Sequence, residues 1–200
     1  MILTVVQRIA LVDHLCLRFR ALIRSKESAV EMEAIAKAFN VARLLGAGVP
    51  SEAAFMDTYW TTLGPIIYRP RNAVPTHDNP RPVFHEIGHV VGFWRDPYAF
   101  VTRYATQRGR AELEAEAGRS AMEAWYLLTG ELPASREALD ITRHGYALDS
   151  NPGAHDDHAD LTRDLLEQAL VSVRAGVVST DVGIEVRDWL ARNGITPAVV

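Results

Sequence analysis

Along most of this chain, apolar residues recur every three or four positions, which is the spacing of amphipathic helices. The first such pattern runs from Val5 to Ile23, and a second covers residues 28–45. Two glycines, which interrupt helices, follow the second pattern. We therefore predict a helical hairpin over residues 1–48.

One segment has a different pattern and predicts a β-strand. Residues 59–68, with the sequence YWTTLGPIIY, are rich in β-branched and aromatic side chains and lie just before Pro70. Pro65 has no amide hydrogen to donate to a neighbouring strand, so this segment is expected at a sheet edge or at a bulge.

The pattern becomes helical again after a turn. Asp78 offers a capping side chain and Pro80 suits a first helical turn, so a helix is expected from residue 80 to residue 95, before Asp96-Pro97. Further helices are expected over residues 97–107, 109–129, 161–175 and 182–192.

Together these elements predict an α+β protein that is mostly helical, in a single domain of 200 residues. Residues 1–48 form the hairpin, residues 50–135 the core, and residues 136–200 a C-terminal helical region.

Composition narrows the classes of partner. A net charge of −4 and a pI near 6.0 give no general attraction to nucleic acid or to an anionic membrane, so neither is expected as a partner. No uncharged stretch approaches the 18 or so residues of a membrane span. The single cysteine, Cys16, excludes an internal disulfide and suits a reducing compartment. A cytoplasmic location is expected, or an intravirion one if the protein is phage-derived.

The residues that indicate chemistry are HEIGH, at positions 85–89. On a helix, His85 and His89 lie on one face one turn apart, so both imidazoles can reach one metal ion at about 2.0–2.1 Å. Glu86, beside the first histidine, is placed to act as a base without binding the metal. The HExxH pattern thus predicts that the two histidines are zinc ligands and that the glutamate is a general base. In a random order of these residues, the HExxH pattern arises in about two such chains in a hundred. A pair of histidines that binds no metal is therefore the weaker interpretation.

Here the chain resembles the gluzincin peptidases, the thermolysin-like group, whose third zinc ligand is a glutamate on a later helix. The segment ELEAE at residues 112–116 matches their Glu-x-x-Ala-Asp/Glu arrangement. The resemblance implies that Glu112 binds zinc and that Glu116 accepts the other ring N–H of a histidine. Glu116 lies nearer the centre of the apolar stripe, so these two roles are interchangeable. Glu114 is the third option.

The resemblance also implies a fold and an activity. The fold is zincin-like, with a small sheet packed on the HExxH helix, and the edge strand before that helix pairs with an extended peptide. The activity is zinc-dependent endopeptidase cleavage of a peptide or protein, in which Glu86 deprotonates a zinc-bound water. A second donor has to stabilise the oxyanion, and the candidates are His144 and Tyr146 first, then Tyr104.

Several alternatives remain open. The run from His89 to Gly92 also resembles the metzincin pattern, but Arg95 stands at its third-ligand position and Asp96 follows one residue late. The chain is alternatively a zinc-binding structural or interaction protein without turnover, for instance phage- or toxin-associated, or a metal-free helical adaptor. Glu86 favours the enzyme, because a structural zinc site needs no base. The sequence indicates no oligomeric state.

Overall fold

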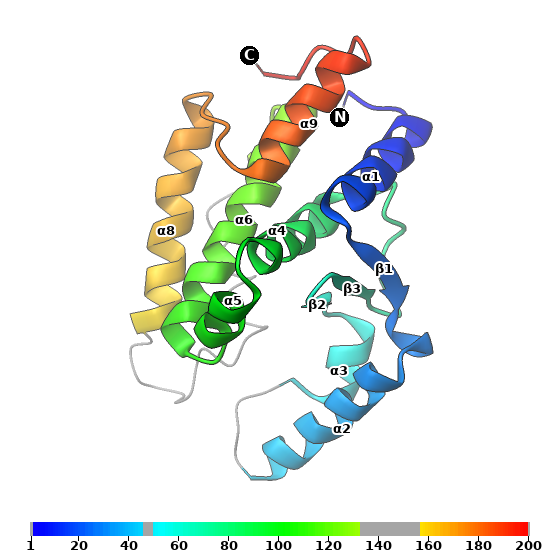
Figure 1. Ribbon diagram of the computed structural model, residues 1–200, viewed down its shortest axis with the longest axis vertical. Helices are drawn as coiled ribbons and strands as arrows, with labels where there is room; N and C mark the ends of the chain where they lie inside the picture. Colours follow the sequence, from blue (N-terminus) through cyan, green and yellow to red (C-terminus); the bar gives the residue numbers. More distant parts are fainter. Residues whose placement is uncertain (1, 46–49, 133–156, 200) are drawn as a thin grey trace.

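The structure, a computed structural model, describes residues 2–45, 50–132 and 157–199 (Figure 1). These residues form eight α-helices and one three-stranded sheet, so the predicted α+β, mostly helical class is confirmed. No helix among them has the length and apolar content needed to cross a membrane. The helices are α1 (Val5–Phe19), α2 (Val30–Leu44), α3 (Glu52–Asp57), α4 (Arg81–Arg95), α5 (Pro97–Tyr104), α6 (Gln107–Thr129), α8 (Asp157–Arg174) and α9 (Asp181–Arg192).

The sheet consists of β1 (Leu22–Ser25), β2 (Thr61–Leu63) and β3 (Ile66–Arg69), in the order β1-β3-β2. The central strand β3 runs parallel to β1 and antiparallel to β2. Strand β2 is therefore an edge strand of this sheet, and helix α4 contacts both β2 and β3. A small sheet does pack on the helix that carries HEIGH.

The two faces of the sheet pack on different helices. Ile67 of β3 belongs to a core cluster with residues of α1, α4, α6 and α9, whereas its neighbour Tyr68 belongs to a cluster with residues of α2 and α3. Successive side chains of a strand point to opposite faces, so this alternation is expected. Figure 1 shows the result: the sheet lies between α4 on one side and the α2–α3 pair on the other.

Two predictions about local structure are wrong. The segment 59–68 is not one strand, because Gly64, with φ of +57°, and Pro65 form a turn that divides it into β2 and β3. The N-terminal region is not a helical hairpin either. Helix α1 ends at Arg20 in the left-handed conformation, and the chain then enters β1, so α1 packs on α4 and α9 while α2 packs on α3.

Helices α4 and α6 cross in close contact. A Cβ atom on Gly88 of α4 would lie 2.9 Å from the Cα of Ala117 and 3.2 Å from the side chain of Ser120 on α6. Because such distances leave no room for a methyl group, glycine at position 88 permits this approach of the two backbones. The crossing decides which side chains of α6 face the two histidines.

Candidate metal centre

The imidazoles of His85 and His89 point at each other from successive turns of α4. Their Nε2 atoms lie 3.2 Å apart, and both residues are buried, with exposed fractions of 8% and 6%. The apolar face of α4, which includes Val83, Ile87 and Val90, is buried in the core and holds the helix in this orientation. The pairing expected from the four-residue spacing is therefore present.

The acid that meets them is Glu114 of α6, which is 2% exposed. Its Oε2 lies 3.0 Å from Nε2 of His85, and its Oε1 lies 3.3 Å from Nε2 of His89. Among the described residues, His85, His89 and Glu114 form the group of side chains that could hold a metal ion.

The spacing of the three donor groups fits a divalent cation. A tetrahedral ion about 2.0–2.1 Å from each ligand atom places those atoms about 3.3–3.4 Å apart. The two Nε2 atoms lie 3.2 Å apart, and the Glu114 carboxylate approaches that of His85 to 3.0 Å with Oε2 and that of His89 to 3.3 Å with Oε1. Oε1 of Glu114 is buried and has no hydrogen-bond partner among the described residues. An unsatisfied buried acceptor is costly, and a cation would satisfy it.

Charge in the cluster also favours a cation. Burial raises the pKa of Glu114, but the charge of His89 and the hydrogen bond with His85 outweigh burial and lower this pKa to about 2. Burial likewise lowers the pKa of His89, whereas the Glu114 carboxylate, with smaller effects of Glu86 and Glu116, raises it to about 9. The negative charge that retains a proton on His89 would equally attract a metal ion.

The structure corrects the expected roles of Glu112 and Glu116. Side chains two residues apart on a helix point about 200° apart, so a helix that presents Glu114 to the histidines turns both neighbouring acids away. Glu112 pairs with Arg103 and Arg108, and Glu116 pairs with Arg103 at 2.7 Å. The remaining ring nitrogen of His89, Nδ1, accordingly has no partner from Glu116 and is unpaired among the described residues.

Glu86 lies next to the metal cluster but outside it. Its side chain is 4% exposed, and its Oε2 accepts a hydrogen bond of 2.6 Å from Oγ1 of Thr62 on β2. Sequence spacing gave no sign of Thr62, because the contact depends on how the sheet is placed against α4.

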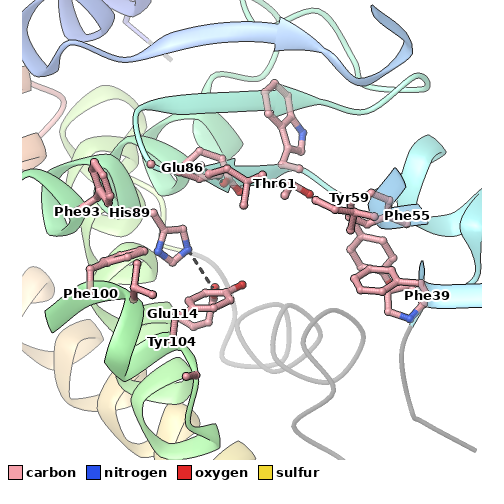
Figure 2. A pocket seen from close by; sticks show the side chains of 18 residues that line it. Phe39, Phe55, Tyr59, Thr61, Glu86, His89, Phe93, Phe100, Tyr104 and Glu114 are labelled. Carbon is pink, nitrogen blue, oxygen red and sulfur yellow. Dashed lines mark hydrogen bonds and ion pairs between the residues drawn. The ribbon is translucent and has the colours of Figure 1, made fainter. Parts of the chain in front are cut away.

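A cavity of about 490 Å³ opens beside Glu86, His89 and Glu114. Figure 2 shows these three side chains at one end and Phe39, Phe55 and Tyr59 at the other, with Phe100 and Tyr104 along one wall. The cavity therefore lies between α2–α3 and the pair α4–α5, with β2 along one side. Its lining is mainly aromatic and aliphatic: Ile35, Phe39, Pro50, Phe55, Tyr59, Trp60, Leu63, Phe93, Phe100, Val101, Tyr104 and Ala105.

Tyr104 is the described candidate for oxyanion stabilisation. Its ring stacks on Phe100, with centroids 6.1 Å apart, and lines the cavity. Burial raises the pKa of its hydroxyl, and the charges of Glu114 and Glu86 raise it further, so the hydroxyl keeps its proton and can donate it in a hydrogen bond. His144 and Tyr146, the other two candidates, lie outside the described residues.

The positions of the metzincin alternative have other partners. Arg95 pairs with Asp181 of α9 at 2.9 Å, and the Asp96 side chain caps α5 by accepting a hydrogen bond from the amide of Ala99. Neither residue contributes to the cluster of potential ligands.

Comparison with protein-family models, with curated proteins and with solved structures finds no match to this chain.

Proposed function

We propose that this protein is a zinc-dependent peptidase in which His85, His89 and Glu114 hold the metal and Glu86 is the catalytic base. The observation that carries the proposal is the convergence of these three donor groups beside a buried glutamate, at the end of a cavity. A purely structural site would need neither Glu86 nor the cavity.

The donor set favours zinc. Two imidazoles and one carboxylate are the protein ligands of catalytic zinc sites in which a fourth position is left for water or substrate. Imidazole nitrogen and carboxylate oxygen suit zinc better than calcium or magnesium, which prefer oxygen ligands alone.

Each residue then has a distinct role in hydrolysis. The metal, when bound, supplies Lewis-acid polarisation of the scissile carbonyl and lowers the pKa of water. Glu86 takes a proton from the attacking water as the water oxygen bonds to the carbonyl carbon. Glu86 then gives this proton to the amide nitrogen as the C–N bond breaks. The Tyr104 hydroxyl donates a hydrogen bond to the developing oxyanion.

The shape of the site supports a peptide with a large apolar side chain as substrate. The aromatic rings of Phe39, Phe55 and Phe100 offer apolar surface, and a bulky side chain placed among them displaces water from it. Edge strand β2 runs along the same cavity and gives a peptide backbone a place to pair.

A Glu86→Gln variant tests the proposal. Replacing the carboxylate by an amide removes the base without changing the metal ligands, so the variant should still bind about one zinc per chain. Its kcat should be lower by at least about 100-fold. Cleavage of a peptide pool is measured by mass spectrometry. Glu112→Gln, the same change on the outer side of α6, is the matched control and should cleave like wild type.

Two outcomes contradict this function. One is undiminished cleavage by Glu86→Gln. The other is wild-type protein with one zinc per chain that cleaves no peptide in the pool, which would favour a structural zinc-binding protein.

A further inference from the structure

The hydrogen bond between Thr62 and Glu86 joins the edge strand to the proposed base. Thr62 Oγ1 is 2.6 Å from Oε2 of Glu86. A carboxylate has no proton to donate, so the threonine hydroxyl is the donor. Such charge-assisted hydrogen bonds are short and stronger than neutral ones, so this contact restrains the Glu86 side chain.

Strand register explains why Thr62 reaches Glu86. Thr62 lies opposite Ile67 in the antiparallel β2–β3 pair. Paired residues share a face of the sheet, and Ile67 faces the core that includes α4. Thr61 and Leu63 pair with Tyr68 and Ile66, whose side chains pack toward α2 and α3. Within this strand, Thr62 is thus the residue directed at α4.

We propose that Thr62 is a positioning residue for Glu86, an inference that rests on the proposed peptidase function. Its hydroxyl occupies Oε2, which leaves Oε1 to take the proton of the attacking water. Once Oε1 is protonated, Oε2 is a carbonyl-type oxygen and still accepts the hydrogen bond from Thr62. The same hydrogen bond therefore persists while the O–H bond of water breaks, while the proton sits on Oε1, and while it leaves for the amide nitrogen.

This arrangement also links the base to substrate binding. Thr62 lines the cavity and belongs to the edge strand along which a peptide would pair. A peptide that orders β2 would order the donor that holds Glu86. Loss of the hydroxyl should consequently affect turnover more than binding of the peptide.

The first test compares Thr62→Val, which removes the hydroxyl at nearly constant shape, with Thr62→Ser, which keeps it. Thr62→Val should lower kcat about 10- to 100-fold, as a small displacement of a catalytic group does, with KM within about twofold and zinc content unchanged. Thr62→Ser should restore kcat to within about threefold of wild type. Thr129→Val, at the far end of α6, controls for the loss of any threonine hydroxyl.

A second test does not depend on turnover. In zinc-loaded protein labelled with ¹³C at the glutamate side-chain carboxyl groups, the Glu86 resonance is the one missing from Glu86→Gln. This resonance should shift in Thr62→Val and return to its place in Thr62→Ser. An unchanged resonance in Thr62→Val would show that the hydrogen bond is absent and would overturn the inference.

The two proposals fail in different ways. Full kcat in Thr62→Val, or a Thr62→Ser variant as slow as Thr62→Val, overturns the role of Thr62 and leaves the peptidase intact. Wild-type protein that binds zinc without cleaving any peptide overturns the peptidase, and with it the catalytic role of Thr62.

Discussion

Nε2 of His85 lies 3.0 Å from an oxygen of Glu114, although the two residues are 29 positions apart in the chain. They meet because α4 and α6 cross where Gly88 faces Ala117, one turn of α6 beyond Glu114. The proposed third ligand is therefore selected by the packing of two helices.

The first prediction concerns the identity of that ligand. Glu114→Ala should weaken zinc binding by at least about 100-fold, because it removes one of three protein ligands from a site whose total binding energy is on the order of 10 kcal/mol. Competition with a chromophoric chelator measures this affinity.

Glu112→Ala and Glu116→Ala are its controls, since both side chains pair with arginines outside the cluster. Each should bind zinc within about threefold of wild type. If Glu112→Ala or Glu116→Ala weakened zinc binding more than Glu114→Ala does, that residue would be the third ligand, as the resemblance implies.

The second prediction concerns the helix crossing. Gly88→Ala places a methyl group 2.9 Å from a backbone atom of α6, so the helices must separate. We expect the free energy of unfolding, measured with urea, to fall by about 1–3 kcal/mol, even though alanine favours helix by about 1 kcal/mol. Zinc affinity should fall as well, because the histidines move away from Glu114.

Gly92→Ala is the matched control on the same helix. There the added Cβ meets only the Phe100 ring, at 3.3 Å, and a side chain can yield where a backbone cannot. Equal stability and equal zinc affinity of Gly88→Ala and wild type would refute the close-contact argument.

The third prediction concerns Lys26, which sequence reasoning did not single out. Its side chain is fully buried, with Nζ 2.7 Å from the carbonyl oxygen of Phe55 and 3.5 Å from the centroid of the Phe55 ring. Burial lowers the pKa of this amine to about 7, against the opposing charge of Glu86. An unfolded chain retains the lysine proton up to about pH 10.4.

Between about pH 7 and 10, the unfolded state thus binds more protons than the folded state at this position, and stability rises with pH. Lys26→Met lacks this contribution. The unfolding free energy of wild type minus that of the variant should increase with pH, by at most about 1.4 kcal/mol per pH unit. Urea unfolding of both proteins at several pH values measures this difference. Both proteins contain the same metal site, so its contribution to the pH dependence cancels. Parallel pH curves would disprove the lowered pKa.

Local patterns predicted the helices well. The helix predicted over residues 80–95 is α4, although its N-cap is Pro80 and no side chain caps it, so the cap expected from Asp78 is wrong. Helices α8 and α9 begin and end within a few residues of the predicted ranges. The predictions that are wrong concern segments whose structure depends on contacts with neighbouring helices or strands. The predicted apolar helical pattern extends to Ile23, yet Leu22–Ser25 form β1 because this segment pairs with β3. Segment 59–68 has strand composition throughout, but the backbone of Gly64 turns it into a hairpin.

The sequence alone determined the pairing of His85 and His89 and the place of Glu86 beside them, because residues four apart on one helix share a face whatever surrounds the helix. It did not determine the acid. Glu112, Glu114 and Glu116 alternate around α6, and only the contact at Gly88 decides which of them faces α4. The hydrogen bond from Thr62 likewise depends on strand register and on the packing of the sheet against α4. Spacing within one helix is a local property, whereas these contacts join separate elements and exist only in the folded chain.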